Sequence, residues 1–322
     1  MAGCSVLPGG GPKQAAPATA TATPTPSAAP VTAQETASVL EDYVKRNNAA
    51  NKAKNDKLLA GYEGGSSLVI DKAAYASSRK LGRRDGYQPF GYTKPTYTVP
   101  AVKEGRWFLT TAYWKSKIGT AEEPTYLVFA SAGDSWRQMY ATDAFEGQVA
   151  AGLPEIATDA SGTAEAVAHS DSSGLIMSPA TFAKSYAAHL AGKGTETSKS
   201  RFAADWLTTD ASSNRVKMSQ YAKLTESARP ATVYPSYALR TADGGALAFT
   251  TIERTRRYDV HQGPQRNYVF RKDNGLLPGK YYTYMKTTEL IQVVARIPPK
   301  TADLGQVEVI GSQGGITSGS GR

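Results

Sequence analysis

Residues 246–260, ALAFTTIERTRRYDV, decide the fold predicted for this chain. They are rich in the β-branched and aromatic residues that favour strands. A tight-turn sequence, Asp-Gly-Gly at 243–245, stands directly before them, and 231–240 before the turn has a similar strand-forming composition. We therefore expect 231–240 and 246–260 to pair as an antiparallel hairpin, and we predict further strands at 280–297 and 305–310.

Helices are expected before these strands. Ser178 is suited to cap a helix and Pro179 to occupy its first position, so SPATFAKSYAAHL begins a helix. A second helix is predicted at about 213–226. The first half of the chain shows the same order of elements. Helix-forming sequence from 35 to about 62 and a shorter helix at 71–81 precede four predicted strands, at 96–102, 106–116, 125–132 and 136–142.

This order predicts an α+β fold with two similar units, each with helices packed on a curved antiparallel sheet. Such an arrangement resembles the NTF2-like and cystatin-like architectures. We expect the first unit at 35–145 and the second at 177–312, joined by a connecting segment at 146–176. The Gly/Ser-rich residues 313–322 are predicted to form a flexible tail.

The N-terminal 34 residues are expected to form a tether. Residues 5–34 are almost all Ala, Thr, Pro and Gly, a composition that cannot build a core. Cys4 is the only cysteine of the chain. The sequence Met1-Ala2-Gly3-Cys4 resembles the end of a bacterial lipobox, although the basic and apolar signal regions that normally precede it are missing. The alternatives for Cys4 are a lipid attachment site and an accidental free thiol.

Positive charge is concentrated in the second half. The formal charge of the chain is +9, and residues 201–300 hold 16 Lys and Arg against 8 Asp and Glu. A basic face of this kind favours binding to anionic lipid headgroups, anionic wall polymer or nucleic acid. Nucleic acid is the least suitable of these partners for a protein that a lipid on Cys4 would hold outside the cytoplasm. A solvated face without a partner is the alternative. The candidate anion-binding residues are Arg254, Arg256, Arg257, Arg266, Arg271 and Lys272.

The sequence offers few residues for catalysis or metal binding. Its three histidines, His169, His189 and His261, lie far apart without a metal-ligand spacing, and we expect no metal and no cofactor. Ser77 and Lys80 match the S-x-x-K pattern of penicillin-binding enzymes, but solvated charge explains this basic stretch better. Carboxylates near strands are candidates to line a cavity, where burial would raise their pKa: Asp134, Glu253 and Asp259.

One segment carries a family resemblance. The residues that carry it are Leu153, Pro154, Ile156, Asp159, Gly162 and Ala164, together with the helix SPATFAKSYAAHLAG that follows. They look like an uncharacterised family of actinobacterial, Streptomyces-like lipoproteins, over most of residues 35–315. The resemblance implies a surface location and no known activity.

We therefore expect a non-enzymatic protein that a lipid on Cys4 anchors to the outer face of the cell membrane. It would bind another envelope component, either a protein or an anionic wall polymer. Two alternatives remain: a small-ligand-binding or enzymatic NTF2-like protein, and a polyanion-binding module that uses the basic second half. No apolar run is long enough to cross a bilayer.

Overall fold

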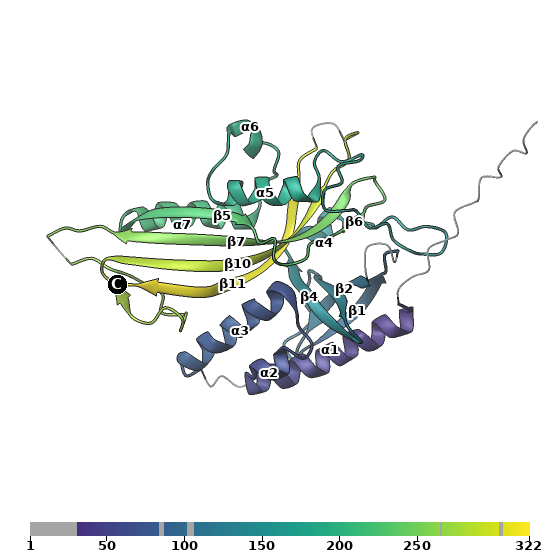
Figure 1. Cartoon of the computed structure of the whole chain (residues 1–322), viewed down its shortest axis with the longest axis horizontal. Coiled ribbons are helices and arrows are strands. Elements are labelled where there is room, and N and C mark those ends of the chain that lie inside the picture. The colour runs from purple at the N-terminus through teal and green to yellow at the C-terminus, as the bar shows by residue number, and fades with distance from the viewer. Residues whose placement is uncertain (1–30, 84–86, 102–105, 265, 303–304) are drawn as a thin grey trace, which may run out of the picture.

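Figure 1 shows the computed structural model, which describes residues 31–83, 87–101, 106–264, 266–302 and 305–322. Cys4 and most of the predicted tether lie outside the described residues. The first half contains the helices α1 (Ala33–Ala53), α2 (Asp56–Leu59) and α3 (Gly65–Lys80), then the strands β1 (Gly91–Thr98), β2 (Trp107–Lys115), β3 (Thr125–Ala132) and β4 (Ser135–Ala144).

The second half repeats this order of helices before strands. Its helices are α4 (Gln148–Ala151), α5 (Pro179–Leu190), α6 (Glu196–Lys199) and α7 (Trp206–Ser219). Its strands are β5 (Ala222–Pro230), β6 (Tyr237–Arg240), β7 (Ala246–Val260), β8 (Val269–Phe270), β9 (Lys280–Tyr281), β10 (Tyr284–Ile297) and β11 (Glu308–Gly321). The predicted α+β class is confirmed.

A single antiparallel sheet of nine strands runs through both halves. Its order is β1-β2-β3-β4-β11-β10-β7-β5, and β6 pairs with β7. The halves join where β11 meets β4, through the pairs Gly311–Ala144 and Ser312–Asp143. Strands β8 and β9 form a separate small hairpin. The two predicted units therefore share one sheet instead of folding around separate ones.

Helices cover the outer faces of this sheet. In Figure 1, α1 lies below the strands of the first half, α3 lies below β11 and β4, and α5 and α7 lie above β5 and β7. On the α5 side, Phe182 and Tyr186 pack on Ile252 of β7 in one buried cluster. On the α1 side, Leu40 packs with Phe108 of β2. Apolar burial of this kind supplies most of the stability that helices have in a protein.

The two halves also pack on each other. Trp107 and Leu109 of β2 point away from α1 and form a third buried cluster with Leu247 and Phe249 of β7. Side chains alternate between the faces of a strand, so β7 contacts α5 with one set of residues and the first half with the other. Because of this double packing, β7 is buried on both faces over its first seven residues.

Several predicted elements agree closely with the structure. Strand β7 has the predicted bounds 246–260, and the Ser178 side chain caps α5 by accepting a hydrogen bond from the Thr181 amide. The helix predicted at 213–226 is wrong in its second part. Helix α7 ends at Ser219, and 222–230 instead form β5, which pairs with β7 along its whole length. Tertiary pairing overrides the local helical propensity here.

The predicted flexible tail at 313–322 is also wrong, because β11 extends to Gly321. This strand pairs with β10 from Arg296–Glu308 to Met285–Gly321. Its glycines allow close contacts: a Cβ atom on Gly319 would lie 2.3 Å from Cδ2 of the buried Leu277. The Gly/Ser composition therefore serves packing at this position, where a side chain has no space.

Replacing Gly319 with Ala is expected to destabilise the protein by about 1–3 kcal/mol, because the new methyl group overlaps Leu277. Gly315→Ala is the matched control on the same strand, since its Cβ would make an ordinary 3.5 Å contact with Ile70. Urea unfolding of both variants measures the difference. Equal stability of the two variants would contradict the packing role of Gly319.

Candidate functional site

A pocket of about 530 Å³ lies where the β8–β9 hairpin approaches α7. We call it the β8–β9 pocket. Its walls come from α7, from Tyr258 of β7, from Met285 of β10 and from the segment 267–273. The cations among its lining residues are Lys217, Arg271 and Lys272, and its aromatic rings are Tyr221, Tyr258, Tyr268 and Phe270.

A second hollow of about 590 Å³ adjoins this pocket. Phe270, Arg271 and Lys272 line both cavities, so this short segment forms the wall between them. Two further lysines, Lys80 and Lys280, line the second hollow. Phe270 is half exposed although it is a large apolar residue. The end of the molecule that carries β8 and β9 therefore combines accessible aromatic surface with several positive charges.

Cations and rings also contact each other beside the pocket. The Arg266 guanidinium lies 3.9 Å from the ring centroid of Tyr282, and the Lys280 ammonium lies 4.3 Å from that of Tyr268. Such contacts hold a cation in place without neutralising it. Arg257 differs, because its Nε donates to Asp259 over 2.8 Å while its guanidinium lies 4.3 Å from the Tyr284 ring.

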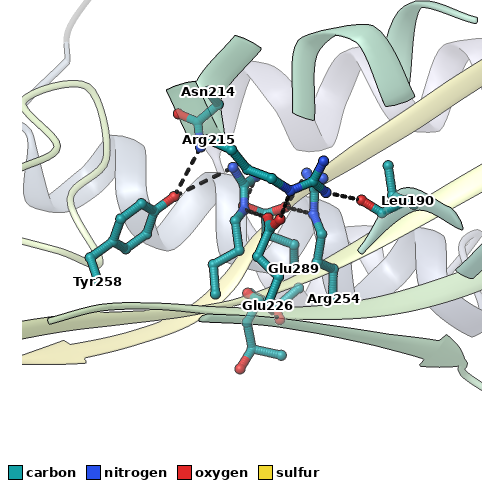
Figure 2. A network of polar contacts seen from close by, with 10 residues as sticks. Leu190, Asn214, Arg215, Glu226, Arg254, Tyr258 and Glu289 are labelled. Carbon is teal, nitrogen blue, oxygen red and sulfur yellow. Dashed lines mark hydrogen bonds and ion pairs between the residues drawn. The ribbon is translucent and has the colours of Figure 1, made fainter. Parts of the chain in front are cut away.

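Arg254 and Arg256 lie elsewhere, in a buried network with two glutamates (Figure 2). Each is only 5% exposed. Arg254 donates from Nη2 to Glu289 over 2.7 Å, and Arg256 donates to the other oxygen of the same carboxylate. Their charges are thus paired inside the protein. The sequence prediction that these two arginines contact an external anion is corrected by this burial.

The network extends to helix α7. Glu226 of β5 accepts a hydrogen bond from Arg215 Nε, and Arg256 Nε lies 3.8 Å from the other oxygen of Glu226. Burial alone would raise the pKa of Glu289, but Arg256 and Arg254 together hold it below its usual value. Three guanidinium groups face two carboxylates, so the network as a whole carries a positive charge.

Tyr258 connects this network to the β8–β9 pocket (Figure 2). Its hydroxyl oxygen accepts from Arg256 Nη1 and from Asn214 Nδ2, each over 3.4 Å. The hydroxyl group of Tyr258 is thus directed into the buried network, and Tyr258 is also one of the residues that line the pocket. The positive charge of the network lies behind this wall, which suits a negatively charged ligand group.

Replacing Glu289 with Gln is expected to destabilise the protein by about 3 kcal/mol, because it leaves two buried guanidinium groups without their carboxylate. Glu253→Gln is the matched control on the neighbouring strand. Its partner Arg229 is 75% exposed, so its loss should cost less than about 0.5 kcal/mol. Chemical denaturation measures both changes, and similar losses in the two variants would contradict this role of Glu289.

The other residues considered for chemistry do not converge. The three histidines lie in different places: His189 stacks on Phe202, the exposed His261 hydrogen-bonds to the Ser219 carbonyl, and burial lowers the pKa of His169. Within the described part of the chain, no group of three or more His, Cys, Asp or Glu could hold a metal ion.

The S-x-x-K match and the carboxylate candidates have structural roles. The Ser77 hydroxyl accepts a hydrogen bond from the Gly275 amide, and Ser77 is almost fully buried. Glu253 pairs with Arg229, and Asp259 with Arg257. Asp134 lies in the turn between β3 and β4. None of these three carboxylates lines the β8–β9 pocket.

The fold and the pocket define an α+β protein with a basic, aromatic cavity at one end of a shared sheet. The chain belongs to the family of the domain of unknown function DUF8094, whose model matches residues 28–321. In the part of the chain that the structure describes, no helix is long and apolar enough to cross a membrane.

Relatives in Streptomyces are lipoproteins by name. An uncharacterised lipoprotein of Streptomyces coelicolor is 32% identical over 301 residues, covering 90% of this chain and 86% of the relative. Another from the same organism is 27% identical, covering 90% and 83%. One from Streptomyces avermitilis is 29% identical, covering 71% and 68%. No solved structure matches. The relatives agree with the lipoprotein resemblance of residues 153–164 and the α5 region.

Proposed function

We propose that this chain is a non-enzymatic, lipid-anchored protein of the outer face of the cell membrane, and that its β8–β9 pocket binds a phosphate-bearing lipid headgroup. Two observations support the anchor: the lipobox-like Met1-Ala2-Gly3-Cys4 and the lipoprotein names of the relatives. One observation carries the ligand. The pocket combines three cations and a single carboxylate, Asp273, with aromatic walls.

The chemistry of the pocket favours an amphiphilic anion. Lys217, Arg271 and Lys272 attract phosphate, while the Phe270 ring and the methionine side chains accept the apolar part next to it. A purely polar polymer would leave these apolar walls in contact with water. Anionic lipid offers both a phosphate for the cations and an apolar part for the walls. Each basic residue contributes about 1 kcal/mol of binding free energy near an anionic membrane surface.

The proposed anchor leaves the pocket free to reach the membrane. Helix α1 begins at the right of Figure 1, whereas β11 ends and β10 begins at the left, beside the hairpin that forms the pocket. Cys4 precedes α1 by 29 residues. An extended chain spans about 3.3 Å per residue, so a tether of this length reaches roughly 90 Å. The body can therefore turn its basic end towards the bilayer.

We further propose that the two halves are related units of NTF2-like or cystatin-like type. Each half places its helices before an antiparallel meander, and the sheet order β1-β2-β3-β4 is mirrored by β5-β7-β10-β11 about the junction. Duplication of one ancestral unit would give this arrangement. The alternative of a small-ligand-binding or enzymatic NTF2-like protein rests on this type of unit.

The anchor is tested by supplying a lipoprotein signal segment before Met1 in an actinobacterial host that is fed an alkyne fatty acid. We expect the protein to carry the label in the membrane fraction, because Cys4 provides the thiol for acylation. Cys4→Ser should lose the label and Ser5→Ala should keep it. An exported wild-type chain without label, or label that survives Cys4→Ser, would contradict the anchor.

Headgroup binding is tested with the unlipidated full chain and vesicles of phosphatidylcholine with or without phosphatidylglycerol. Arg271→Ala/Lys272→Ala should weaken binding to the anionic vesicles about tenfold or more, since two phosphate-binding cations are lost. Lys115→Ala/Lys117→Ala removes the same charge from exposed positions at the end of β2 and is the control. Co-sedimentation at two salt concentrations provides the measurement.

The outcomes separate the possible ligands. Salt-sensitive binding that only the pocket variant weakens supports the proposal. Equal loss in both variants would indicate general charge attraction and contradict a pocket. Binding of soluble polyphosphate without binding of anionic vesicles would assign the site to an anionic polymer instead. An Arg256→Ala variant is unsuitable for this test, because it would disturb the buried network.

A further inference from the structure

The first half contains a different kind of hollow, which is separate from the β8–β9 pocket and plays no part in the proposed headgroup binding. It measures about 190 Å³ and lies between α1, α3 and the strands β1–β4. Polar side chains form most of its wall, and five of them are amides: Asn47, Asn51, Gln138, Gln292 and Gln313. Among the described residues that line it there is no lysine, arginine or histidine.

Hydrogen bonds fix the buried amides in position. Gln292 donates to Ser66 and Ser67, and its own oxygen accepts from the Ala141 amide over 3.1 Å. Gln138 donates to Ser67 over 2.9 Å. Asn47 donates to the Tyr43 hydroxyl over 3.0 Å. A wall of prearranged amides of this kind offers donors and acceptors at low entropic cost to a ligand.

Carboxyl groups add acceptors to this wall. Asp143 accepts a hydrogen bond from Thr125 over 2.7 Å, and both residues line the hollow. Asp71 also lines it and accepts a hydrogen bond from the carboxyl group of Glu63, which is 2% exposed. Burial, and then the charge of Asp71, raise the pKa of Glu63, and burial raises that of Asp71. This pair therefore retains a proton near neutral pH.

Flat aromatic surface stands at the opening. The rings of Phe90 and Trp114 are stacked with centroids 6.3 Å apart and planes 21° apart, and both line the hollow. Trp114 is 39% exposed, which is unusual for a tryptophan in a folded domain. Gln313 at the rim is exposed as well. The exposed ring faces are available to cover the apolar side of a ligand.

We infer that this hollow, which we call the amide pocket, binds one uncharged sugar ring of a saccharide. Sugar hydroxyls both donate and accept hydrogen bonds, so they match amides and carboxylates together. The C–H face of a pyranose matches an exposed tryptophan ring. The volume lies below the range of about 300–1,000 Å³ that is typical of drug-sized ligands and suits a single ring.

Other ligand classes fit the amide pocket less well. An anion would meet carboxylates without a compensating cation in the wall. A metal ion lacks the necessary ligands in the described part of the chain. An apolar ligand would leave the carboxylates Asp71 and Asp143 and the exposed amide of Gln313 without hydrogen-bond partners. Among these classes a neutral, hydroxyl-rich molecule fits the wall best, and the test below separates it from an amine.

The test uses the unlipidated full chain and a panel of neutral methyl glycosides of glucose, galactose, mannose, arabinose and N-acetylglucosamine, with glucosamine as the amine counterpart. Saturation-transfer-difference NMR detects binding at millimolar concentration, and titration gives the dissociation constant. At least one glycoside is expected to bind, and Trp114→Ala should weaken it about tenfold or more. Trp206→Ala is the matched control, because this tryptophan is also exposed but lies on α7 and does not line the amide pocket.

Each outcome decides the inference. Binding that Trp114→Ala weakens and Trp206→Ala leaves unchanged supports the sugar site. Absence of binding across the panel, or binding that persists in Trp114→Ala, would overturn it. Preference for glucosamine over every neutral sugar would show that the carboxylates select an amine, which also contradicts the inference. The variant Arg271→Ala/Lys272→Ala should bind sugar normally, so failure of headgroup binding leaves this result interpretable.

Discussion

The pairing of β11 with β10 on one side and β4 on the other is the constraint on which the rest of the structure depends. It joins the strands of both halves into one sheet. Glycines make this possible, since Gly311 and Gly314 approach neighbouring backbone too closely for a side chain. A strand without bulky side chains can lie at the centre of a bent sheet where other sequences cannot. The position of β10, and thus of Glu289, follows from it.

Strand register then brings the charged residues together. Glu289 of β10 lies directly opposite Arg254 of β7, and Glu226 of β5 lies opposite Arg256. These side chains share one face of the sheet because residues 254 and 256 are two apart. A shift of one residue would turn the arginines to the other face and leave the glutamates unpaired. The network thus penalises wrong registers more than it adds stability, as expected for buried ion pairs.

The sequence predicted much of the local structure but not the contacts between distant segments. The bounds of β7 and the cap of α5 depend on nearby residues, and both predictions are confirmed. The role of β11 depends on Leu277 and on partner strands, and no local pattern in a Gly/Ser-rich segment indicates them. Composition alone suggested a tail. The same limit applies to β5, whose partner β7 begins more than twenty residues later.

The candidate sites were also predicted only where their residues are close together in the sequence. A run of cations indicated Arg271 and Lys272, which line the β8–β9 pocket, whereas Lys217, Tyr221 and Tyr258 come from other elements and carried no signal. Arg254 and Arg256 looked like surface charge, because their partners lie about thirty residues away. The amide pocket was not predicted, since single Asn and Gln residues are common everywhere. Both sites depend on the shared sheet for their shape.

Hydrogen–deuterium exchange of the full chain tests the central place of β11 most directly. If residues 313–321 form a strand of the sheet, the amides among them that bond to β10 should exchange slowly, because they open only when this pairing opens. Peptides that cover β11 would then retain a protected fraction of amides for as long as peptides that cover β10. Exchange of residues 313–321 within seconds, as in an unstructured tail, beside a protected β10 would contradict this account.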